Sequence, residues 1–279
     1  GTWMPALAAD APPLVTAFVF AGGQAMALYL ILVFGGAAPW VMRDPAMPVI
    51  LQLAGLVTAL SGGVMAAAQR DLGRLFGYAA LSELGYLLMA LVAGGSQSQA
   101  LAMLIMVSRT LAITLMGAAI AIIRHRAGTD RFADLGGVAR RLPIATVGLV
   151  IGGLALAGFP LTSSFPTHWA VGRSIWAWAQ PLSALAPKAA PNADALPLGL
   201  GASMLVLLPL IASSVGILIG LLRSLSAMLG AESRKDIGSQ PILASLMILG
   251  LIALVAMVGL RPQLFLERAL SAVAAFSSF

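Results

Sequence analysis

The stretch MLIMVSRTLAITLMGAA, at residues 103–119, is apolar throughout except for three hydroxyl side chains and one charge, Arg109. With its apolar flanks it extends over about 98–124, which exceeds the roughly 20 residues that a helix needs to cross about 30 Å of hydrocarbon. A strand of a membrane barrel would instead alternate apolar and polar residues over about 10 positions. The stretch therefore predicts a transmembrane α-helix with an arginine near its middle.

The whole chain has the composition of a membrane protein. Hydrophobic residues make up 60% of its 279 residues and charged residues 9%, whereas a soluble domain carries roughly 25% charged residues. A soluble protein this apolar would expose large sticky patches. We therefore expect an all-α, polytopic membrane helix bundle. We attribute the formal net charge of +6 to loop topology rather than to binding of nucleic acid.

The hydropathy pattern predicts about seven crossings in a single transmembrane domain, 1–279. We place them at about 11–34, 47–68, 74–95, 98–124, 143–179, 198–228 and 241–260. The segment 143–179 is too long for one straight helix and contains Gly158, Pro160 and Pro166. Because proline removes a backbone donor and clashes with the preceding turn, we expect a discontinuous helix here. The alternative is two short spans, which would reverse the topology downstream.

The loops on one predicted side hold most of the basic residues. They are Arg70, Arg74, Arg124, Arg126, Arg131, Arg140, Arg141, Arg223, Arg234 and Lys235. The positive-inside rule puts this side in the cytoplasm. Residues 125–142 are then a solvated cytoplasmic basic loop and 181–197 an outer loop. The protein is expected in the bacterial inner (cytoplasmic) membrane or an equivalent energy-coupling membrane.

The two ends of the chain carry weaker signals. Residues 1–10 look like an incomplete opening segment before the first crossing. Residues 261–279 place Leu264, Leu266, Leu270 and Val273 against three charged side chains. This pattern predicts an amphipathic tail helix on the membrane or on a partner, or else a frayed terminus.

Three ionisable residues inside predicted crossings are candidates for a proton path. A charge at the centre of a membrane helix costs about 2.5–3.5 kcal/mol on insertion scales, so it marks a functional site by default. Arg109 stays protonated and would set the field along a path; alternatively it forms an ion pair that locks the packing. Glu83 is a carboxylate in a crossing; alternatively it snorkels to the interface or pairs with Arg74. His168 suits a proton shuttle; alternatively it is a hydrogen-bonded core histidine.

The sequence QRDLGRLFGYAALSELGY at residues 69–86 carries the most specific motif. It resembles a segment of the antiporter-like membrane subunits of respiratory complex I, related membrane-bound hydrogenases and multisubunit cation/proton antiporters. The matching positions are Gln69, Asp71, Arg74, Tyr78, Ser82, Gly85 and Tyr86. The matches are dense and need no gap.

Other segments agree with this family in order and spacing. TWMP at residues 2–5 looks like the start of its eighth helix, and GFPLT at 158–162 looks like the signature at the break of its twelfth. The resemblance implies that the chain corresponds to the eighth to fourteenth helices. It places Arg109 at the position of a lysine in the eleventh helix, His168 at an ionisable position after the break, and Glu83 where the family has His or Gln.

The resemblance implies part of a proton or cation path in a complex I type membrane arm, coupled to electron transfer elsewhere. The alternative is a non-conducting structural subunit derived from the same fold; a stand-alone transporter is a third hypothesis. Other membrane subunits and lipid are the expected partners, with no small-molecule substrate bound by this chain alone. With no cysteine and two histidines, and no Gly-rich phosphate loop, we expect no metal site, no cofactor and no catalytic centre in this chain.

Overall fold

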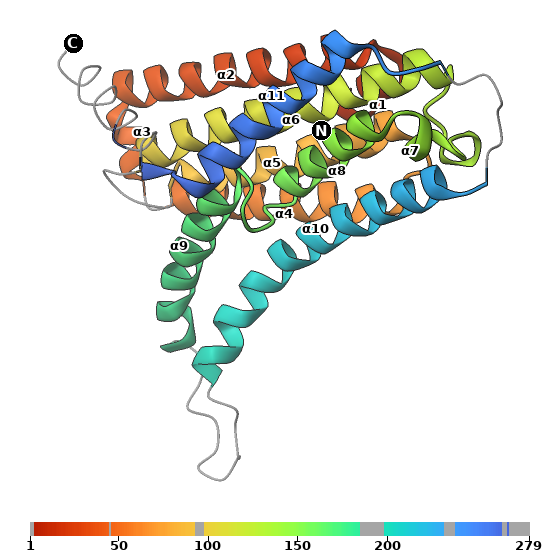
Figure 1. Cartoon of the computed structure of the whole chain (residues 1–279). Coiled ribbons are helices and arrows are strands. Elements are labelled where there is room, and N and C mark those ends of the chain that lie inside the picture. Colours follow the sequence, from red (N-terminus) through yellow and green to blue (C-terminus); the bar gives the residue numbers. More distant parts are fainter. Residues whose placement is uncertain are drawn as a thin grey trace.

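The computed structural model describes residues 3–44, 46–92, 98–184, 198–231, 238–263 and 267, and within them the chain is almost entirely helical (Figure 1). The helices are α1 (Trp3–Asp10), α2 (Pro13–Ala37), α3 (Pro39–Arg43), α4 (Ala46–Ala68), α5 (Leu72–Ala90), α6 (Ser98–Ala127), α7 (Val138–Arg141), α8 (Pro143–Leu156), α9 (Phe165–Ala184), α10 (Leu198–Leu229) and α11 (Ile242–Leu260). A 3₁₀ turn covers Phe132–Asp134. The expected all-α membrane bundle is therefore confirmed.

Five helices are long and apolar enough to cross a membrane by themselves. They lie at Pro13–Gly35, Ala46–Ala68, Gln99–Ala127, Leu207–Leu229 and Ile242–Leu260. The crossing expected at 74–95 corresponds to α5, and the discontinuous crossing expected at 143–179 corresponds to α8 and α9. Most of the residues in α5 are buried inside the bundle, so its polar residues face protein rather than lipid.

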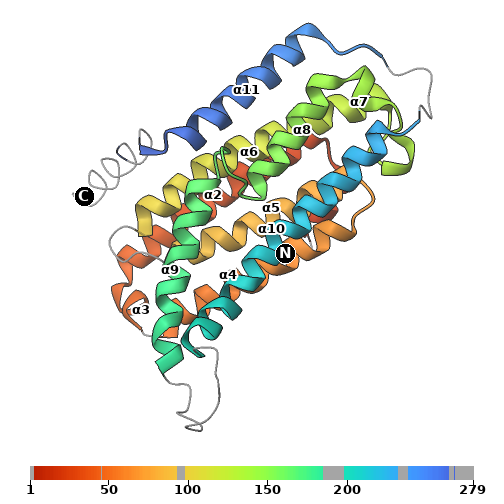
Figure 2. The ribbon, with the colours of Figure 1, turned by 60° about the horizontal axis from the view of Figure 1, so that its bottom comes forward.

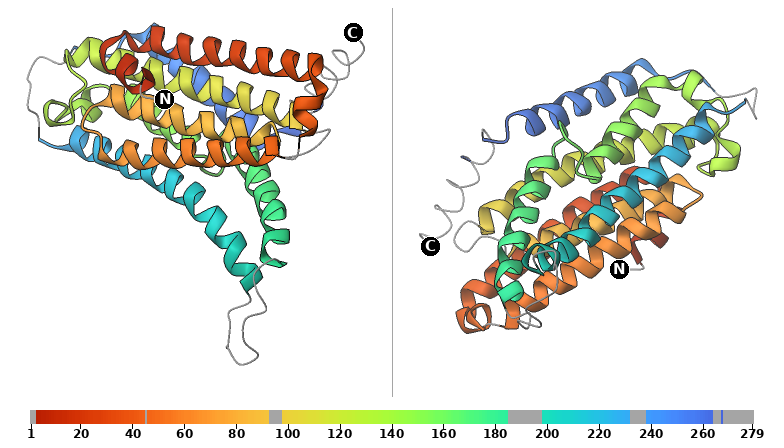
Figure 3. Two further views of the ribbon diagram at one scale, coloured as in Figure 1. Left: turned by 180° about the vertical axis from the view of Figure 1, so that it is seen from behind. Right: turned by 90° about the horizontal axis from the view of Figure 1, so that it is seen from below.

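The long helices run side by side, and α9 and the first half of α10 depart from them. Figures 1 and 2 show α2, α4, α5, α6, α8 and α11 packed along one another. In the same views α9 and the beginning of α10 diverge from the bundle and project beyond it. Figure 3 shows this projection from behind and from below. The segment between α8 and α9 connects the bundle to this projection.

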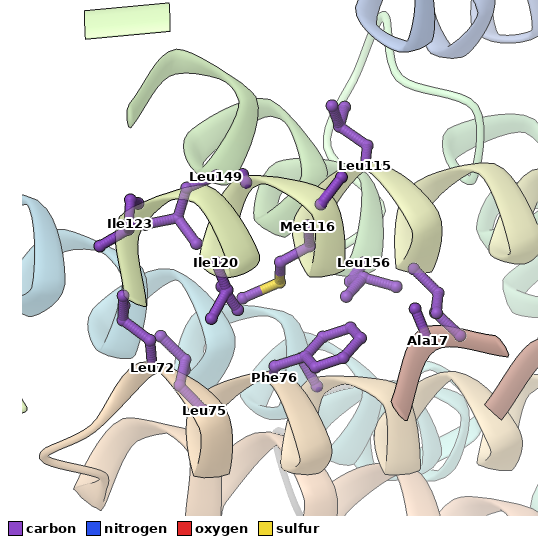
Figure 4. Close-up of a cluster of buried hydrophobic side chains, with 14 of the residues drawn as sticks. Ala17, Leu72, Leu75, Phe76, Leu115, Met116, Ile120, Ile123, Leu149 and Leu156 are labelled. Carbon is purple, nitrogen blue, oxygen red and sulfur yellow. The ribbon is translucent and has the colours of Figure 1, made fainter. Parts of the chain in front are cut away.

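The main apolar core lies between α5, α6 and α8. Figure 4 shows Phe76 of α5, Met116 of α6 and Leu156 of α8 pointing toward one another. All three belong to one cluster of buried side chains. Burying side chains of this size in close-packed contact fixes the relative positions of the three helices. The site described below is built on these same three elements together with α9.

Glycine residues of α4 set its spacing to α5 and to α10. A Cβ atom built on Gly63 would collide with the backbone of Ser213 in α10, and one built on Gly62 would lie 2.5 Å from the amide nitrogen of Ser82 in α5. Such small residues let helix backbones approach closely in membranes. Gly22 and Gly23 of α2, by contrast, have no heavy atom within 4 Å of an added Cβ.

The predicted basic loop 125–142 is more ordered than a solvated connector. The helix α6 continues to Ala127, and Leu135 and Val138 are fully buried. The amide of Phe132 donates to the carbonyl of Arg70 and that of Leu72 to the carbonyl of Asp130, both at 2.9 Å. Two buried aliphatic side chains and these backbone hydrogen bonds fasten the loop to the start of α5. Its cytoplasmic location stays a prediction.

The same end of the bundle carries a partly buried ion pair. Arg124 lies 3.9 Å from the carboxylate of Asp130 and donates a hydrogen bond to the carbonyl of Ala11. Burial raises the pKa of Asp130, although Arg124 opposes this shift. Arg124 thus joins α6 to the connection between α1 and α2.

The predicted ends and outer loop are only partly described. Residues 3–10 of the opening segment form α1, and Met4 and Ala8 on this helix are buried. Residues 181–184 of the expected outer loop belong to α9, and 185–197 lie outside the described residues. Nearly all of the expected amphipathic tail, 261–279, also lies outside them.

Candidate functional site

The break between α8 and α9 places the first functional side chain. The helix α8 ends at Leu156, and Gly158 and Leu161 then adopt φ values of +69° and +70°. Pro160 lies within the break, as expected. Pro166 does not: it occupies the first turn of α9, where a missing amide hydrogen costs nothing and the fixed φ favours a helix. Pro166 therefore helps to start α9 rather than to interrupt it.

Gly158 also holds the imidazole of His168 in place. A Cβ atom at Gly158 would lie 2.6 Å from both Cγ and Nδ1 of His168. The positive φ of Gly158 adds strain for any other residue. The conformation of the break and the position of the imidazole thus depend on each other.

We expect Gly158→Ala to lower the stability of the protein in detergent by about 1–3 kcal/mol, the usual cost of a strained backbone position. Thermal unfolding monitored by circular dichroism measures this change. Gly172→Ala in α9 is the matched control, because an added Cβ there meets no heavy atom within 4 Å. Equal unfolding temperatures for the two variants would contradict the constraint assigned to Gly158.

The structure brings the three candidate residues together from three helices. Glu83 comes from α5, Arg109 from α6 and His168 from α9. Glu83 and Arg109 are 1% and 0% exposed, and the His168 side chain is 9% exposed. His168 Nε2 lies 3.6 Å from Glu83 Oε1. Glu83 does not pair with Arg74, because Arg74 lies 3.8 Å from Asp71 instead.

Arg109 is held by a backbone contact rather than by a close ion pair. Its Nη2 donates to the carbonyl of Ala80 at 3.0 Å. It interacts electrostatically with Glu83, but within the described residues no carboxylate oxygen lies within 4.0 Å of its guanidinium. This permanent positive charge therefore lies near Glu83 without contacting its carboxyl oxygens. It leaves the carboxylate free to accept hydrogen bonds from other groups.

The hydrogen bonds of His168 fix which nitrogen faces Glu83. His168 Nδ1 lies 2.8 Å from the carbonyl oxygen of Ser164. A carbonyl oxygen only accepts, so Nδ1 must carry the hydrogen. In the neutral imidazole Nε2 is then an acceptor, and it points toward Glu83. A single proton between Nε2 and the carboxyl group of Glu83 is therefore enough for a hydrogen bond between the two side chains. The ring of Tyr86 packs edge-on against the imidazole, with 3.7 Å between ring centroids.

Several polar atoms of this cluster have hydrogen-bonding capacity to spare. In the part of the chain that the structure describes, five of the seven buried side-chain atoms that lack a hydrogen-bond partner belong to this cluster: Glu83 Oε1, Arg109 Nε, Arg109 Nη1, Ser164 Oγ and His168 Nε2. Buried polar groups are nearly always paired with protein or with ordered water. A cluster of five such atoms is a place where water and protons can be held inside an apolar bundle.

Hydroxyl groups that the sequence did not single out surround the cluster. Ser163 Oγ donates to the carbonyl of Ser108 at 3.1 Å, which ties the break to α6. Ser82 Oγ lies 2.6 Å from Ser213 Oγ, and Ser213 donates to the carbonyl of Ala59 at 2.8 Å. Because Ser213 already donates its hydrogen, Ser82 must donate to Ser213. The paired serines Ser163 and Ser164 beside Pro166 are the signal that could have pointed to this region.

These observations define a polytopic membrane protein in which a broken helix brings a histidine to a buried carboxylate and a buried arginine. Within the described residues no three His, Asp or Glu side chains gather into a metal site. Such ionisable groups between membrane helices mark ion or proton pathways.

Comparison with known proteins identifies the family. Residues 1–189 match the family described as "NADH:quinone oxidoreductase/Mrp antiporter, TM". The chain is 30% identical over 277 residues to NADH-quinone oxidoreductase subunit N 2 of Acidobacterium capsulatum, covering 95% of this chain and 52% of that protein. It is 29% identical over 179 residues to F(420)H(2) dehydrogenase subunit M of Methanosarcina mazei, covering 61% and 34%. The chain belongs to this family, and it spans about half or less of the length of these relatives.

Solved structures agree on the fold. A chain of the Mrp complex from Dietzia sp. superposes with a TM-score of 0.73 at 18% identity, covering 96% of this chain and 54% of that one. A chain of respiratory complex I from Thermus thermophilus gives 0.73 at 18% identity, covering 98% and 54%. The likeness extends past residue 168, where motifs in the sequence end.

Proposed function

We propose that this chain is an antiporter-like subunit of a complex I type membrane arm and that it provides part of a proton or cation path. In this proposal the path is coupled to electron transfer elsewhere in the assembly. The observation that carries the proposal is the buried cluster at the break, in which His168 Nε2 and Glu83 Oε1 lie 3.6 Å apart. Membership of the family supports the same assignment.

Each residue has a distinct role in the proposed path. Glu83 and His168 exchange a proton, directly or through one intervening water, because the 3.6 Å separation exceeds a hydrogen bond by less than 1 Å. Arg109 does not carry the proton, since arginine stays protonated. Its fixed positive charge instead contributes to the electrostatic field in which the proton moves. The neighbours expected to supply and accept protons are other membrane subunits.

The test is proton transport by the assembled complex in native membrane vesicles. Glu83→Gln and His168→Gln should each lower the proton flux per electron transferred by at least about 10-fold, a threshold below the roughly 100- to 10,000-fold effect of a lost proton-transfer group. A pH-sensitive dye reports the flux, and the rate of electron transfer is measured in parallel. Thr146→Val is the matched control: Thr146 carries a buried hydroxyl group that donates to the carbonyl of Leu142, the residue just before α8.

The alternative is a structural subunit that conducts nothing. The permanent charge of Arg109 at the position of a family lysine favours it. If all three variants assemble and pump like the unmodified protein, the structural alternative replaces the proposal. A 10-fold loss confined to the Glu83 and His168 variants rejects the structural alternative instead.

A further inference from the structure

A cavity of about 630 Å³ is lined by residues of α9 and α10. Figure 1 shows these two helices diverging from the bundle. Its floor is formed by Tyr86, Gly158 and His168. Its walls are mainly apolar and include Phe165, Trp176, Leu207 and Leu210. The volume falls within the 300–1,000 Å³ of pockets that bind small molecules, which are likewise apolar with a few polar groups.

One permanently charged side chain is among the described residues that line the cavity. Arg173 of α9 borders the cavity and is exposed. Within the described residues it makes no hydrogen bond or ion pair. An arginine in an apolar membrane segment needs a counter-charge or access to the polar interface. Arg173 therefore favours the binding of an anionic group at the edge of an otherwise apolar cavity.

The helix face around Arg173 suits an amphipathic ligand. Trp169, Arg173 and Trp176 follow one another at spacings of four and three residues, so they share one face of α9. Trp169 is 63% exposed. Tryptophan and arginine are the side chains that prefer the headgroup level of a bilayer. At Gly172, between the two tryptophans, an added Cβ would meet no heavy atom within 4 Å. The cavity therefore has unoccupied space beside Arg173.

We infer that this cavity binds an anionic phospholipid, with an acyl chain between α9 and α10 and the phosphate on Arg173. The apolar walls accept the chain, and the guanidinium forms charge-assisted hydrogen bonds with phosphate oxygens. A bare anion would leave the walls unfilled, and an uncharged lipid would leave Arg173 unpaired. The inference does not depend on proton transport.

The experiment uses the full chain in its complex, reconstituted into nanodiscs with phosphatidylglycerol that carries a photoreactive group on its acyl chain. Cross-links should map to peptides of α9 and α10. Unlabelled phosphatidylglycerol should compete about 5-fold better than phosphatidylcholine, which corresponds to the roughly 1 kcal/mol that one basic residue contributes near an anionic surface. An excess of inorganic phosphate should not compete.

Two variants separate the parts of the site. Gly172→Leu fills the free space and should abolish the cross-link, whereas Gly23→Leu, an equally open glycine on α2, should retain it. Arg173→Gln should remove the preference for phosphatidylglycerol and keep the competition by phosphatidylcholine. Assembly of each variant is checked by size-exclusion chromatography, and Gly172→Met, which has a more flexible side chain of similar volume, replaces the leucine variant if that one fails to assemble.

Three results would overturn the inference. A cross-link that persists in Gly172→Leu would place the lipid elsewhere. Equal competition by the two lipids in the unmodified protein would remove the role of Arg173. A photoreactive amino acid at position 176 that captures a neighbouring protein chain, and no lipid, would show that a subunit fills the cavity.

Discussion

Arg109→Met lowers the free energy of unfolding by about 3–5 kcal/mol, the usual result of leaving a buried charge without its partner. In this variant Glu83 stays fully buried but loses the positive charge with which it interacts. The double variant Arg109→Met/Glu83→Gln removes both charges and should recover most of the loss, because replacing a buried pair by neutral residues is often close to neutral. Unfolding in mixed micelles with increasing denaturing detergent measures both values.

The control for this pair of variants is Arg109→Lys. It keeps the positive charge, although a single ammonium group cannot reproduce the planar guanidinium that bonds to the carbonyl of Ala80. It should therefore lose less stability than Arg109→Met. Identical losses in the single and double methionine variants would mean that Arg109 and Glu83 do not stabilise each other, and that packing alone accounts for the arginine.

Gly63→Leu separates α4 from α10 and costs more than about 3 kcal/mol, beyond the usual range for overpacked cores. A side chain at Gly63 collides with the backbone of Ser213, and a backbone cannot turn away as a side chain can. The hydrogen bonds that join Ser82, Ser213 and Ala59 cross the same contact, so the variant also breaks a buried polar chain.

The measurement for Gly63→Leu is the midpoint of thermal unfolding in detergent, with Gly23→Leu as the matched control. Gly23 has open space around it, and leucine is the better helix former by up to about 1 kcal/mol. The two variants should therefore shift the midpoint in opposite directions. A midpoint for Gly63→Leu that is no lower than that of the unmodified protein would show that α4 and α10 can move apart without loss of stability.

The sequence predicts most of the fold because hydropathy and proline placement are local signals. The long apolar helices and the discontinuity near Gly158 follow directly from them. The structure of the loop 125–142 does not, because Leu135 and Val138 are buried by contacts with distant segments. The role of Pro166 does not follow from the sequence either, since proline both interrupts and starts helices and only the surrounding chain decides which.

The candidate site could be predicted residue by residue but not as an arrangement. The cost of placing charge in a membrane singles out Glu83 and Arg109, whichever way their helices face. That Glu83 meets His168 and not Arg74 depends on the rotation of α5 about its axis and on the direction in which α9 leaves the break. Both are set by contacts between helices far apart in the sequence.

The projection of α9 from the bundle has a mechanical consequence for the cluster beneath it. His168 lies three residues beyond Phe165, the first residue of α9, whereas Ala184 ends that helix. At a rise of about 1.5 Å per residue, these points are roughly 4.5 Å and 28 Å from the start of the helix. If α9 turns as a rigid rod about Phe165, a displacement at its far end is reduced about sixfold at His168. His168 Nε2 lies 3.6 Å from Glu83 Oε1, and a good hydrogen bond is roughly 2.8 Å long. Closing this gap thus requires the far end of α9 to move by about 5 Å.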